Sequence, residues 1–192
     1  MARKKRTLAQ KQAIWAAIAA KHGIRNARIA IEEGHKVGIG PALAVAMLEQ
    51  ESGGHNVWGH DPTIFVGGFD RLHNKYWTVH PRRKGYVNKA GYLEYKRQRG
   101  TTRMQGVGPM QLTWWSTQDA ADAIGGCWVP RYNIRIGFKS LSANIKAFGL
   151  RKGIERYNGS GPRAVAYSLS VLAKRAKWAN PRYAAMMRRV MA

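Results

Sequence analysis

Cysteine is almost absent from the chain, and its scarcity excludes two kinds of stabilising site. Cys127 is the single cysteine among 192 residues, so no disulfide can form within the chain and no metal can be held by several thiolates. Long apolar runs are also missing, because no stretch approaches the roughly 20 residues that a membrane-spanning helix needs. We therefore expect one domain, residues 1–192, built on an apolar core that a chain of this length can bury.

Acidic residues are scarce as well. The chain has 10 Asp and Glu against 33 Lys and Arg, a formal net charge of +23. This excess predicts a polyanionic partner, such as nucleic acid, an anionic membrane or a bacterial wall rich in phosphate polymers. A sequence-reading nucleic-acid module usually concentrates its charge on one helix or face. Here the basic clusters are spread along the chain, at 3–6, 82–84, 96–97, 174–175 and 188–189, which favours adhesion to an extended polymer over specific nucleic-acid binding.

Signatures of cofactor and nucleophile sites are missing too. The segment 106–108 lacks the third glycine of a dinucleotide loop, and the sequence has neither a Gly-Lys-Ser/Thr phosphate loop nor a Gly-x-Ser-x-Gly elbow. The helical zinc motif His-Glu-x-x-His is not matched by the candidate ligands His55, His60, Asp61 and His73. We expect no cofactor and no metal, with the histidines at the surface or hydrogen-bonded.

The N-terminal region superficially resembles a short signal peptide, because a basic tail at 1–6 precedes an apolar run at 13–20. An amphipathic helix explains the segment better. Thr7 can cap it, polar residues at 10–12 interrupt its apolar side, and Gly23 can end it. We therefore expect a helix here and no export signal.

Helical signals dominate the rest of the chain. Expected helices cover 26–33, 114–124 and 134–148, and two others begin at Pro41 and Pro162, since proline is favoured at the first helical position. A last basic helix is expected over 181–191. Residues 58–106 hold eight aromatic residues and show weak helical periodicity, so we predict an irregular insertion with possible short strands. The predicted fold class is mainly α.

One carboxylate stands out in the helix that begins at Pro41. Ala44, Leu48 and Glu51 are spaced i, i+4 and i+7 and share a face that is otherwise apolar. Glu49 lies about 200° away around the axis, where solvent is expected. Partial burial and the negative end of the helix dipole should both raise the pKa of Glu51. A carboxylic acid that keeps its proton can protonate a glycosidic oxygen. A glutamate that faces water or pairs with arginine is the alternative.

Three motifs resemble those of lytic transglycosylases and goose-type lysozymes. Residues 51–54 (Glu-Ser-Gly-Gly) resemble the catalytic Glu-Ser motif, 108–112 (Gly-Pro-Met-Gln-Leu) resemble Gly-Leu-Met-Gln, and 156–161 resemble Ala-Tyr-Asn-Ala-Gly. Pro109, Arg156 and Ser160 depart from the family pattern. The runs 59–63 and 111–115 are similar to the lysozyme-like domains of endolysins from phages of actinobacteria. The motifs occur in the family order and together frame residues 41–175.

The resemblance implies a lysozyme-like helical domain whose general acid and base is Glu51. It also implies that substrate is bound by Ser52, Met110, Gln111, Tyr157 and Asn158, with the Tyr157 hydroxyl near Glu51. The insertion at 58–106 departs from the compact family pattern, and we expect it to lie over the cleft. For Met110 and Tyr157 the alternative is ordinary core packing. Some aromatic residues of the insertion could stack on sugars, with Trp58, Trp77 and Tyr92 as candidates, although packing within the insertion explains most of them.

The number of carboxylates at the site would decide the reaction. An inverting hydrolase needs a second carboxylate to activate water, whereas a lytic transglycosylase lets a hydroxyl of the substrate attack. Asp70 and Asp61 are the candidates, with Glu94 a further possibility. Asp61 precedes Pro62, which equally predicts a turn in which its side chain bonds backbone amides. The sequence leaves hydrolysis and transglycosylation open.

We expect the chain to cleave the β-1,4 bond between N-acetylmuramic acid and N-acetylglucosamine, as a monomer that binds peptidoglycan and anionic wall polymers. The resemblance implies a phage-lysin type of wall lysis, with the protein made in the host cytoplasm and acting at the wall. The first alternative is a nucleic-acid-binding or virion structural protein, suggested by the charge of +23. The second is membrane disruption by the basic helix expected at 181–191.

Overall fold

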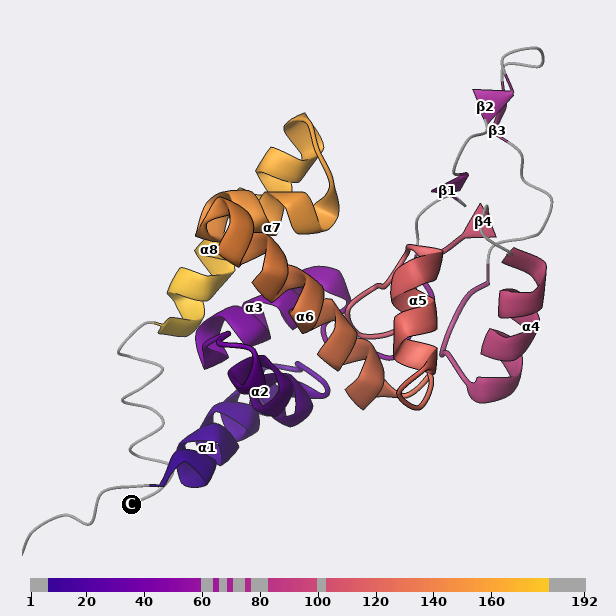
Figure 1. Ribbon diagram of the computed structural model, residues 1–192. Helices are drawn as coiled ribbons and strands as arrows, with labels where there is room; N and C mark the ends of the chain where they lie inside the picture. The colour runs from indigo at the N-terminus through magenta and orange to yellow at the C-terminus, as the bar shows by residue number, and fades with distance from the viewer. Residues whose placement is uncertain are drawn as a thin grey trace, which may run out of the picture.

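A computed structural model describes residues 7–59, 83–99 and 103–179, together with the backbone of the pairs 64–65, 69–70 and 75–76. Within these residues the chain is mainly helical, as predicted (Figure 1). The basic tail at 1–6, the expected C-terminal helix at 181–191, and Asp61, His60, His73 and Trp77 lie outside the described residues. No described helix is long and apolar enough to cross a membrane.

The first two helices follow local signals closely. Helix α1 (Leu8–Lys21) begins at the predicted cap, where Thr7 accepts a hydrogen bond from the Gln10 backbone and the Gln10 side chain bonds back to Thr7. Helix α2 (Ala27–Lys36) continues through Gly34, where we expected it to stop. A Cβ at Gly34 would lie 3.3 Å from the Ile39 carbonyl oxygen, so the glycine serves close packing within the helix rather than its termination.

Helix α3 (Pro41–Glu51) is the centre of the fold and begins at the predicted proline. Every residue from Leu43 to Leu48 is buried, so this part of the helix is covered on all sides and not on one face alone. Helices α1, α2 and α8 pack against it. This arrangement places the end of α3, and therefore Glu51, between other elements instead of at a solvent face.

Three further helices complete the larger part of the molecule. Helix α6 (Pro130–Phe148) ends at Gly149 as predicted but begins four residues before the predicted Ile134. Helix α7 (Leu150–Asn158) was not predicted, and it packs against both α6 and α8 (Pro162–Ala179). Gly153 permits the close approach of α7 to α6, because a Cβ there would lie 2.6 Å from the Ile145 backbone.

The region between Trp58 and Gly106 is more regular than its sequence suggests. It contains helix α4 (Lys89–Arg99), where we predicted an irregular segment. The buried face of α4 consists of Tyr92, Tyr95 and Arg99, spaced i, i+3 and i+7, and a pattern of tyrosine and arginine carries little apolar signal. The region also has two antiparallel pairs, β1 (Ile64–Phe65) with β4 (Arg103–Met104) and β2 (Phe69–Asp70) with β3 (Lys75–Tyr76).

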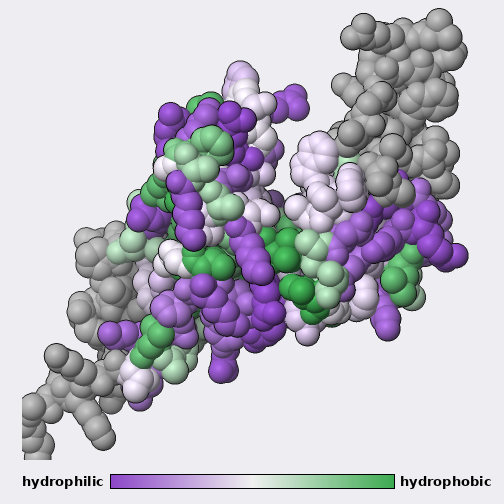
Figure 2. Space-filling model, viewed as in Figure 1, coloured by the Kyte–Doolittle hydropathy of each residue, from purple (hydrophilic) through white to green (hydrophobic). Residues whose placement is uncertain are grey.

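Helix α5 (Trp115–Asp122) lies between this region and the helical part, where it packs against α6. The space-filling view shows a hollow in the surface between the part formed by α7 and α8 and the part formed by α5 (Figure 2). Pale and white side chains of intermediate hydropathy border this hollow on the side of α5. The motif 156–161 begins in α7, whereas the motif 51–54 begins at the end of α3 and the motif 108–112 precedes α5.

Candidate active site

The Glu51 carboxylate is half-buried at the last residue of α3. Its Oε1 atom accepts a hydrogen bond from the hydroxyl of Tyr167, which lies on α8. This contact joins two segments that are 116 residues apart in the sequence. A carboxylate held by a tyrosine hydroxyl has a fixed orientation, which a group that transfers a proton to a bound substrate requires.

Tyr167 was not among the site residues predicted from the sequence. It lies on one face of α8 with Ser170 and Lys174, at i, i+3 and i+7. The Ser170 hydroxyl and the Lys174 ammonium both donate to the Gln50 side-chain oxygen, at 2.8 and 2.7 Å. The spacing of these three polar residues along one face of α8 could have predicted that the face contacts another element. The sequence could not predict that this element is α3.

Glu49 does not face open solvent, contrary to our prediction. It is only partly exposed, and its carboxylate binds the Lys177 ammonium at 2.8 Å and the Trp178 indole nitrogen at 2.6 Å. Burial raises the pKa of Glu49, but these hydrogen bonds outweigh it and leave the pKa below its usual value. The prediction was wrong because α8 packs over Glu49, and helical periodicity cannot reveal which distant element covers a face.

The three sequence motifs meet at the turn 108–111. The Ser52 hydroxyl donates to the Pro109 carbonyl at 2.9 Å, which ties the Glu-Ser motif to this turn. The Tyr157 hydroxyl donates to the Met110 carbonyl at 2.9 Å, which ties the Tyr-Asn motif to it. The fold therefore brings together residues 51–52, 108–111 and 157, although they are spread over more than 100 residues of chain.

Met110 contributes its backbone carbonyl to the candidate site, whereas its side chain lies in the core. The side chain is fully buried, and a Cβ at Gly137 would lie 2.7 Å from the Met110 Cβ. Buried Asn133 holds the turn from α6, accepting from the Met110 N–H at 2.9 Å and donating to the Val107 carbonyl at 2.8 Å. The core-packing alternative describes the Met110 side chain, so we do not retain it as a side chain that contacts substrate.

Gln111 and Asn158 differ in how they are held. The Gln111 amide donates to the Gly108 carbonyl at 2.7 Å and the Val57 carbonyl at 3.2 Å, and its backbone has a positive φ of 48°. Its side-chain oxygen lies against Gly59 and Gly106, where a Cβ would approach it to 2.6 and 2.7 Å. Gln111 is thus part of the framework of the turn. Asn158 ends α7 and is exposed, so its side chain is accessible from solution.

Both tyrosines near Glu51 keep their protons. Burial raises the pKa of Tyr157 well above its usual value, and the charge of Glu51 adds to the effect. Burial also raises the pKa of Tyr167, with further contributions from Glu51 and Tyr157. Both hydroxyls are therefore hydrogen-bond donors over the ordinary pH range, which is how each is used in the structure.

The other described carboxylates form ion pairs with lysine or arginine side chains. Glu32 and Glu33 bind arginines of α6, Glu94 binds Arg83, and Glu155 binds lysine and arginine of its own helix. Asp119 and Asp122 bind Lys96. Glu94 is therefore a weaker candidate for a second catalytic carboxylate than the sequence suggested. The Asp61 residue and the Asp70 side chain lie outside what the structure describes.

Two of the aromatic residues proposed as sugar platforms are buried. Trp58 is almost inaccessible and packs edge-on against Tyr95 at 5.0 Å between ring centres, and Tyr92 is fully buried with its hydroxyl on Asp122. They stabilise the region around α4, as the packing alternative predicted. Trp77 lies outside the described residues.

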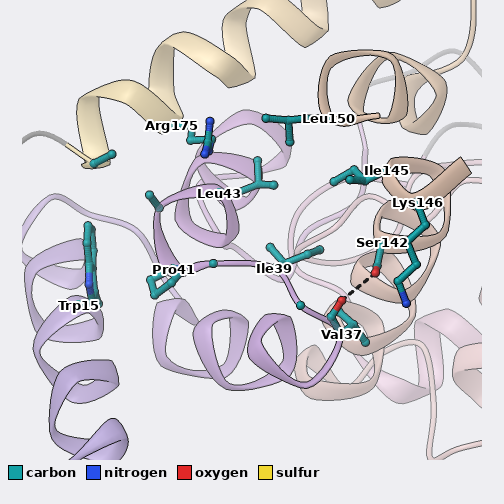
Figure 3. A pocket seen from close by; sticks show the side chains of 14 residues that line it. Trp15, Val37, Ile39, Pro41, Leu43, Ser142, Ile145, Lys146, Leu150 and Arg175 are labelled. Atoms are coloured by element: carbon teal, nitrogen blue, oxygen red, sulfur yellow. Dashed lines mark hydrogen bonds between the residues drawn. The ribbon is translucent and has the colours of Figure 1, made fainter. Parts of the chain in front are cut away.

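A second hollow lies at the opposite end of α3 (Figure 3). This pocket of about 500 Å³ is lined mainly by apolar side chains, among them Trp15, Ile39 and Leu43, with Lys146 and Arg175 at its edge. It includes the N-terminal residues of α3, whereas Glu51 is its C-terminal residue, and the rise of an 11-residue helix separates the two ends by about 15 Å. The pocket is therefore not part of the Glu51 site.

No group of three potential metal ligands occurs among the described residues. Burial raises the pKa of the Cys127 thiol to about 12, so this side chain stays protonated. Comparison of the chain with protein-family models, curated proteins and solved structures finds no match. The geometry of the site is therefore the basis for a functional proposal.

Proposed function

We propose that the chain cleaves the glycan strands of peptidoglycan at the β-1,4 bond between N-acetylmuramic acid and N-acetylglucosamine, in a lysozyme-like fold with Glu51 as general acid. The observation that supports this most strongly is the meeting of the three motifs. Ser52 bonds the Pro109 carbonyl, Tyr157 bonds the Met110 carbonyl and Tyr167 bonds Glu51. Tyr167 and the turn 108–111 are distant from Glu51 in the sequence, yet the first bonds the Glu51 carboxylate and the second bonds its neighbour Ser52.

The proposed chemistry needs one proton donor at the scissile bond. Protonated Glu51 gives its proton to the glycosidic oxygen as the bond to the anomeric carbon breaks. Tyr167 positions the carboxyl group and remains neutral. In transglycosylation Glu51 then accepts the proton of the substrate hydroxyl that attacks the anomeric carbon. In hydrolysis with inversion a second carboxylate, for which Asp70 and Asp61 are the candidates, accepts the proton of the attacking water. Ser52 and Tyr157 hold the turn 108–111 against the helices, and exposed Asn158 is available to contact the sugar.

The charge of the protein supports a role at a polyanionic wall. A formal net charge of +23 attracts phosphate polymers, and this attraction weakens as salt screens it. The monomeric state and the phage-lysin role at the wall belong to the same proposal. No cofactor or metal enters the proposed reaction.

Glu51→Gln tests the proposal, because glutamine keeps the shape of the side chain but cannot donate the proton. We expect this variant to lose at least about 100-fold of the wall-lytic activity while it still binds anionic polymers. Glu49→Gln is the matched control two residues away on the same helix and should remain active. Both variants should unfold at similar denaturant concentrations, which excludes a loss of fold.

Analysis of the released fragments distinguishes the two reactions. Anhydromuramic ends would establish transglycosylation, and reducing muramic ends would establish hydrolysis. If hydrolysis is found, Asp70→Asn and Asp61→Asn identify the residue that activates water.

The charge of +23 also favours a second candidate, a nucleic-acid-binding or virion structural protein. Native protein that binds DNA with sequence preference and never clears a suspension of peptidoglycan would establish this alternative. Lysis that survives in Glu51→Gln would instead favour membrane disruption by the segment 181–191.

A further inference from the structure

Two adjacent tryptophans expose large aromatic surfaces beside the candidate site. Trp114 is 52% exposed and Trp115 is 38% exposed, whereas Trp58 and Trp178 are buried. Isolated exposed apolar residues are common on protein surfaces, but neighbouring exposed aromatic residues are typical of binding sites. Neither residue was among the platforms suggested by the sequence.

The pair lies at the start of α5, shortly after the turn 108–111 that binds Ser52 beside Glu51. Trp114 follows Gln111 by three residues, so their Cα atoms lie within about 11 Å of each other even if the chain is fully extended. The carbonyls of Pro109 and Met110, just before Gln111, bind Ser52 and Tyr157. An extended polymer that passes Glu51 can therefore reach the two indoles.

The backbone that carries the tryptophans is fixed. Buried Gln118 donates to the Leu112 and Thr113 carbonyls at 2.8 and 3.2 Å, and the Thr117 hydroxyl donates to the Trp114 carbonyl at 2.8 Å. The Trp115 N–H points at the Met104 sulfur at 3.0 Å. Aromatic side chains on a fixed backbone bind with little loss of conformational entropy.

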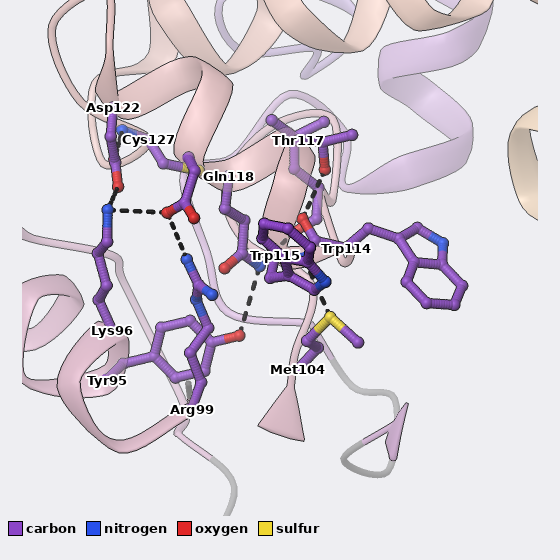
Figure 4. Close-up of polar contacts among 12 residues, drawn as sticks. Tyr95, Lys96, Arg99, Met104, Trp114, Trp115, Thr117, Gln118, Asp122 and Cys127 are labelled. Atoms are coloured by element: carbon purple, nitrogen blue, oxygen red, sulfur yellow. Dashed lines mark hydrogen bonds and ion pairs between the residues drawn. The ribbon is translucent and has the colours of Figure 1, made fainter. Parts of the chain in front are cut away.

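The close-up shows that Trp114 extends away from the polar cluster formed by Lys96, Arg99 and their carboxylate partners (Figure 4). Both cations form ion pairs within the cluster. Lys96 binds Asp119 and Asp122 at 2.8 and 2.6 Å, and Arg99 binds Asp119 at 2.7 Å. Single-stranded nucleic acid also stacks on aromatic rings, but it needs unneutralised cations that follow the phosphates. Within the part of the chain that the structure describes, the cations of this cluster are paired with carboxylates, which favours an uncharged stacking partner.

We propose that Trp114 and Trp115 form a stacking platform for the pyranose rings of the glycan strand, beyond the sugars that flank the scissile bond. The inference rests on the proposed function for the position of that bond. The apolar C–H faces of the sugar lie on the indole faces, while the amide and hydroxyl groups of the strand remain in water. The platform holds the strand in the hollow and sets the length of glycan that binds well.

Binding measured without cleavage tests the platform. In the Glu51→Gln background, the affinity for chitohexaose, a hexamer of β-1,4-linked N-acetylglucosamine, is measured by calorimetry. Retention on insoluble peptidoglycan is measured in 1 M salt, where the screening length is about 3 Å and charge attraction is suppressed. We expect Trp114→Ala with Trp115→Ala to weaken chitohexaose binding by about tenfold or more, and Trp→Phe at both positions to restore part of it.

Leu8→Ala is the matched control, since Leu8 is as exposed as Trp114 but lies at the start of α1, and its affinity should not change. Unchanged affinity in the double alanine variant overturns the platform, as does a loss of single-stranded DNA binding with glycan binding intact. Cleavage by the wild-type protein is scored separately. Chitohexaose binding that depends on the tryptophans, without wall cleavage, would support the platform and contradict the proposed glycan-cleaving function. Wall cleavage with chitohexaose binding unaffected by the tryptophan substitutions would support the proposed function and contradict the platform.

Discussion

Two groups of elements form the site around Glu51: the helices α3, α7 and α8, called the helical side, and the turn region 105–114. The helical side is held by apolar burial, since the residues of α3 from Leu43 to Leu48 are all buried. The turn region is held by side-chain amides that bond backbone groups, among them Gln105, Gln111, Gln118 and Asn133. The comparison shows that one site can be fixed by two unlike kinds of interaction.

The difference matters because the two kinds of interaction fail in different ways. Apolar packing is spread over many contacts, so the loss of one contact is partly compensated by its neighbours. A buried amide that bonds two backbone groups has no substitute, and its loss leaves a donor and an acceptor without partners. The turn region should therefore be the more sensitive side of the site to single substitutions.

The largest effect is expected for Asn133→Ala. The change removes the bonds to the Met110 N–H and the Val107 carbonyl. It leaves the Met110 N–H buried without this acceptor, whereas the Val107 carbonyl still accepts from the Leu112 N–H at 3.0 Å. We expect a loss of about 2–5 kcal/mol in the free energy of unfolding, measured by urea denaturation. Asn144→Ala on the same helix is the control and should change stability little. Equal losses in the two variants would contradict the special dependence of the turn on Asn133.

A smaller effect is expected in acid, at Glu33 of α2, which binds arginines of α6. Burial raises the pKa of Glu33, but hydrogen bonds from Arg135, Lys36 and Arg131 outweigh it and lower the pKa to about 2. A carboxyl whose pKa is depressed by folding stabilises the protein above its unfolded pKa, and this contribution is lost as the pH falls towards the folded pKa.

We therefore expect the wild-type protein to lose about 3 kcal/mol of stability from this group as the pH falls from 4.5 to about 2. Glu33→Gln should lack this part of the dependence. Exposed Glu94→Gln is the control and should retain it. Denaturation curves at successive pH values measure the slopes, and an unchanged slope in Glu33→Gln would remove Glu33 as the cause.

The smallest effect is expected where the two sides are joined. Ser52→Ala removes the bond to the Pro109 carbonyl and should cost about 1 kcal/mol of stability. Ser170→Ala, which removes a bond within the helical side, is its counterpart and should cost a similar amount.

Combination with Tyr157→Phe then distinguishes the two serines. Ser52 and Tyr157 bind neighbouring carbonyls of one turn, so their losses should not add, with a coupling above about 0.5 kcal/mol. The losses of Ser170 and Tyr157 should add. Additive behaviour of Ser52 and Tyr157 would mean that the turn is not held jointly by the two residues.

The sequence predicted the helical side better than the turn side, for a physical reason. A helix start depends on a few neighbouring residues, and the predicted starts at Thr7, Pro41 and Pro162 are those of the structure. Helix α4 was missed because tyrosine and arginine form its buried face. The amide bonds of the turn connect residues up to 54 positions apart, and such pairs leave no local pattern.

The amino-acid order by itself determined that the chain is mainly helical, that Glu51 ends an apolar helix and that charge of one sign dominates. Those features depend on local backbone preferences and on composition. Tertiary structure alone decided that α8 covers Glu49 and brings Tyr167 to Glu51, that the Met110 side chain enters the core, and that Trp114 stays exposed. A sequence specifies the faces of each helix, but only packing between distant segments decides which neighbour covers each face.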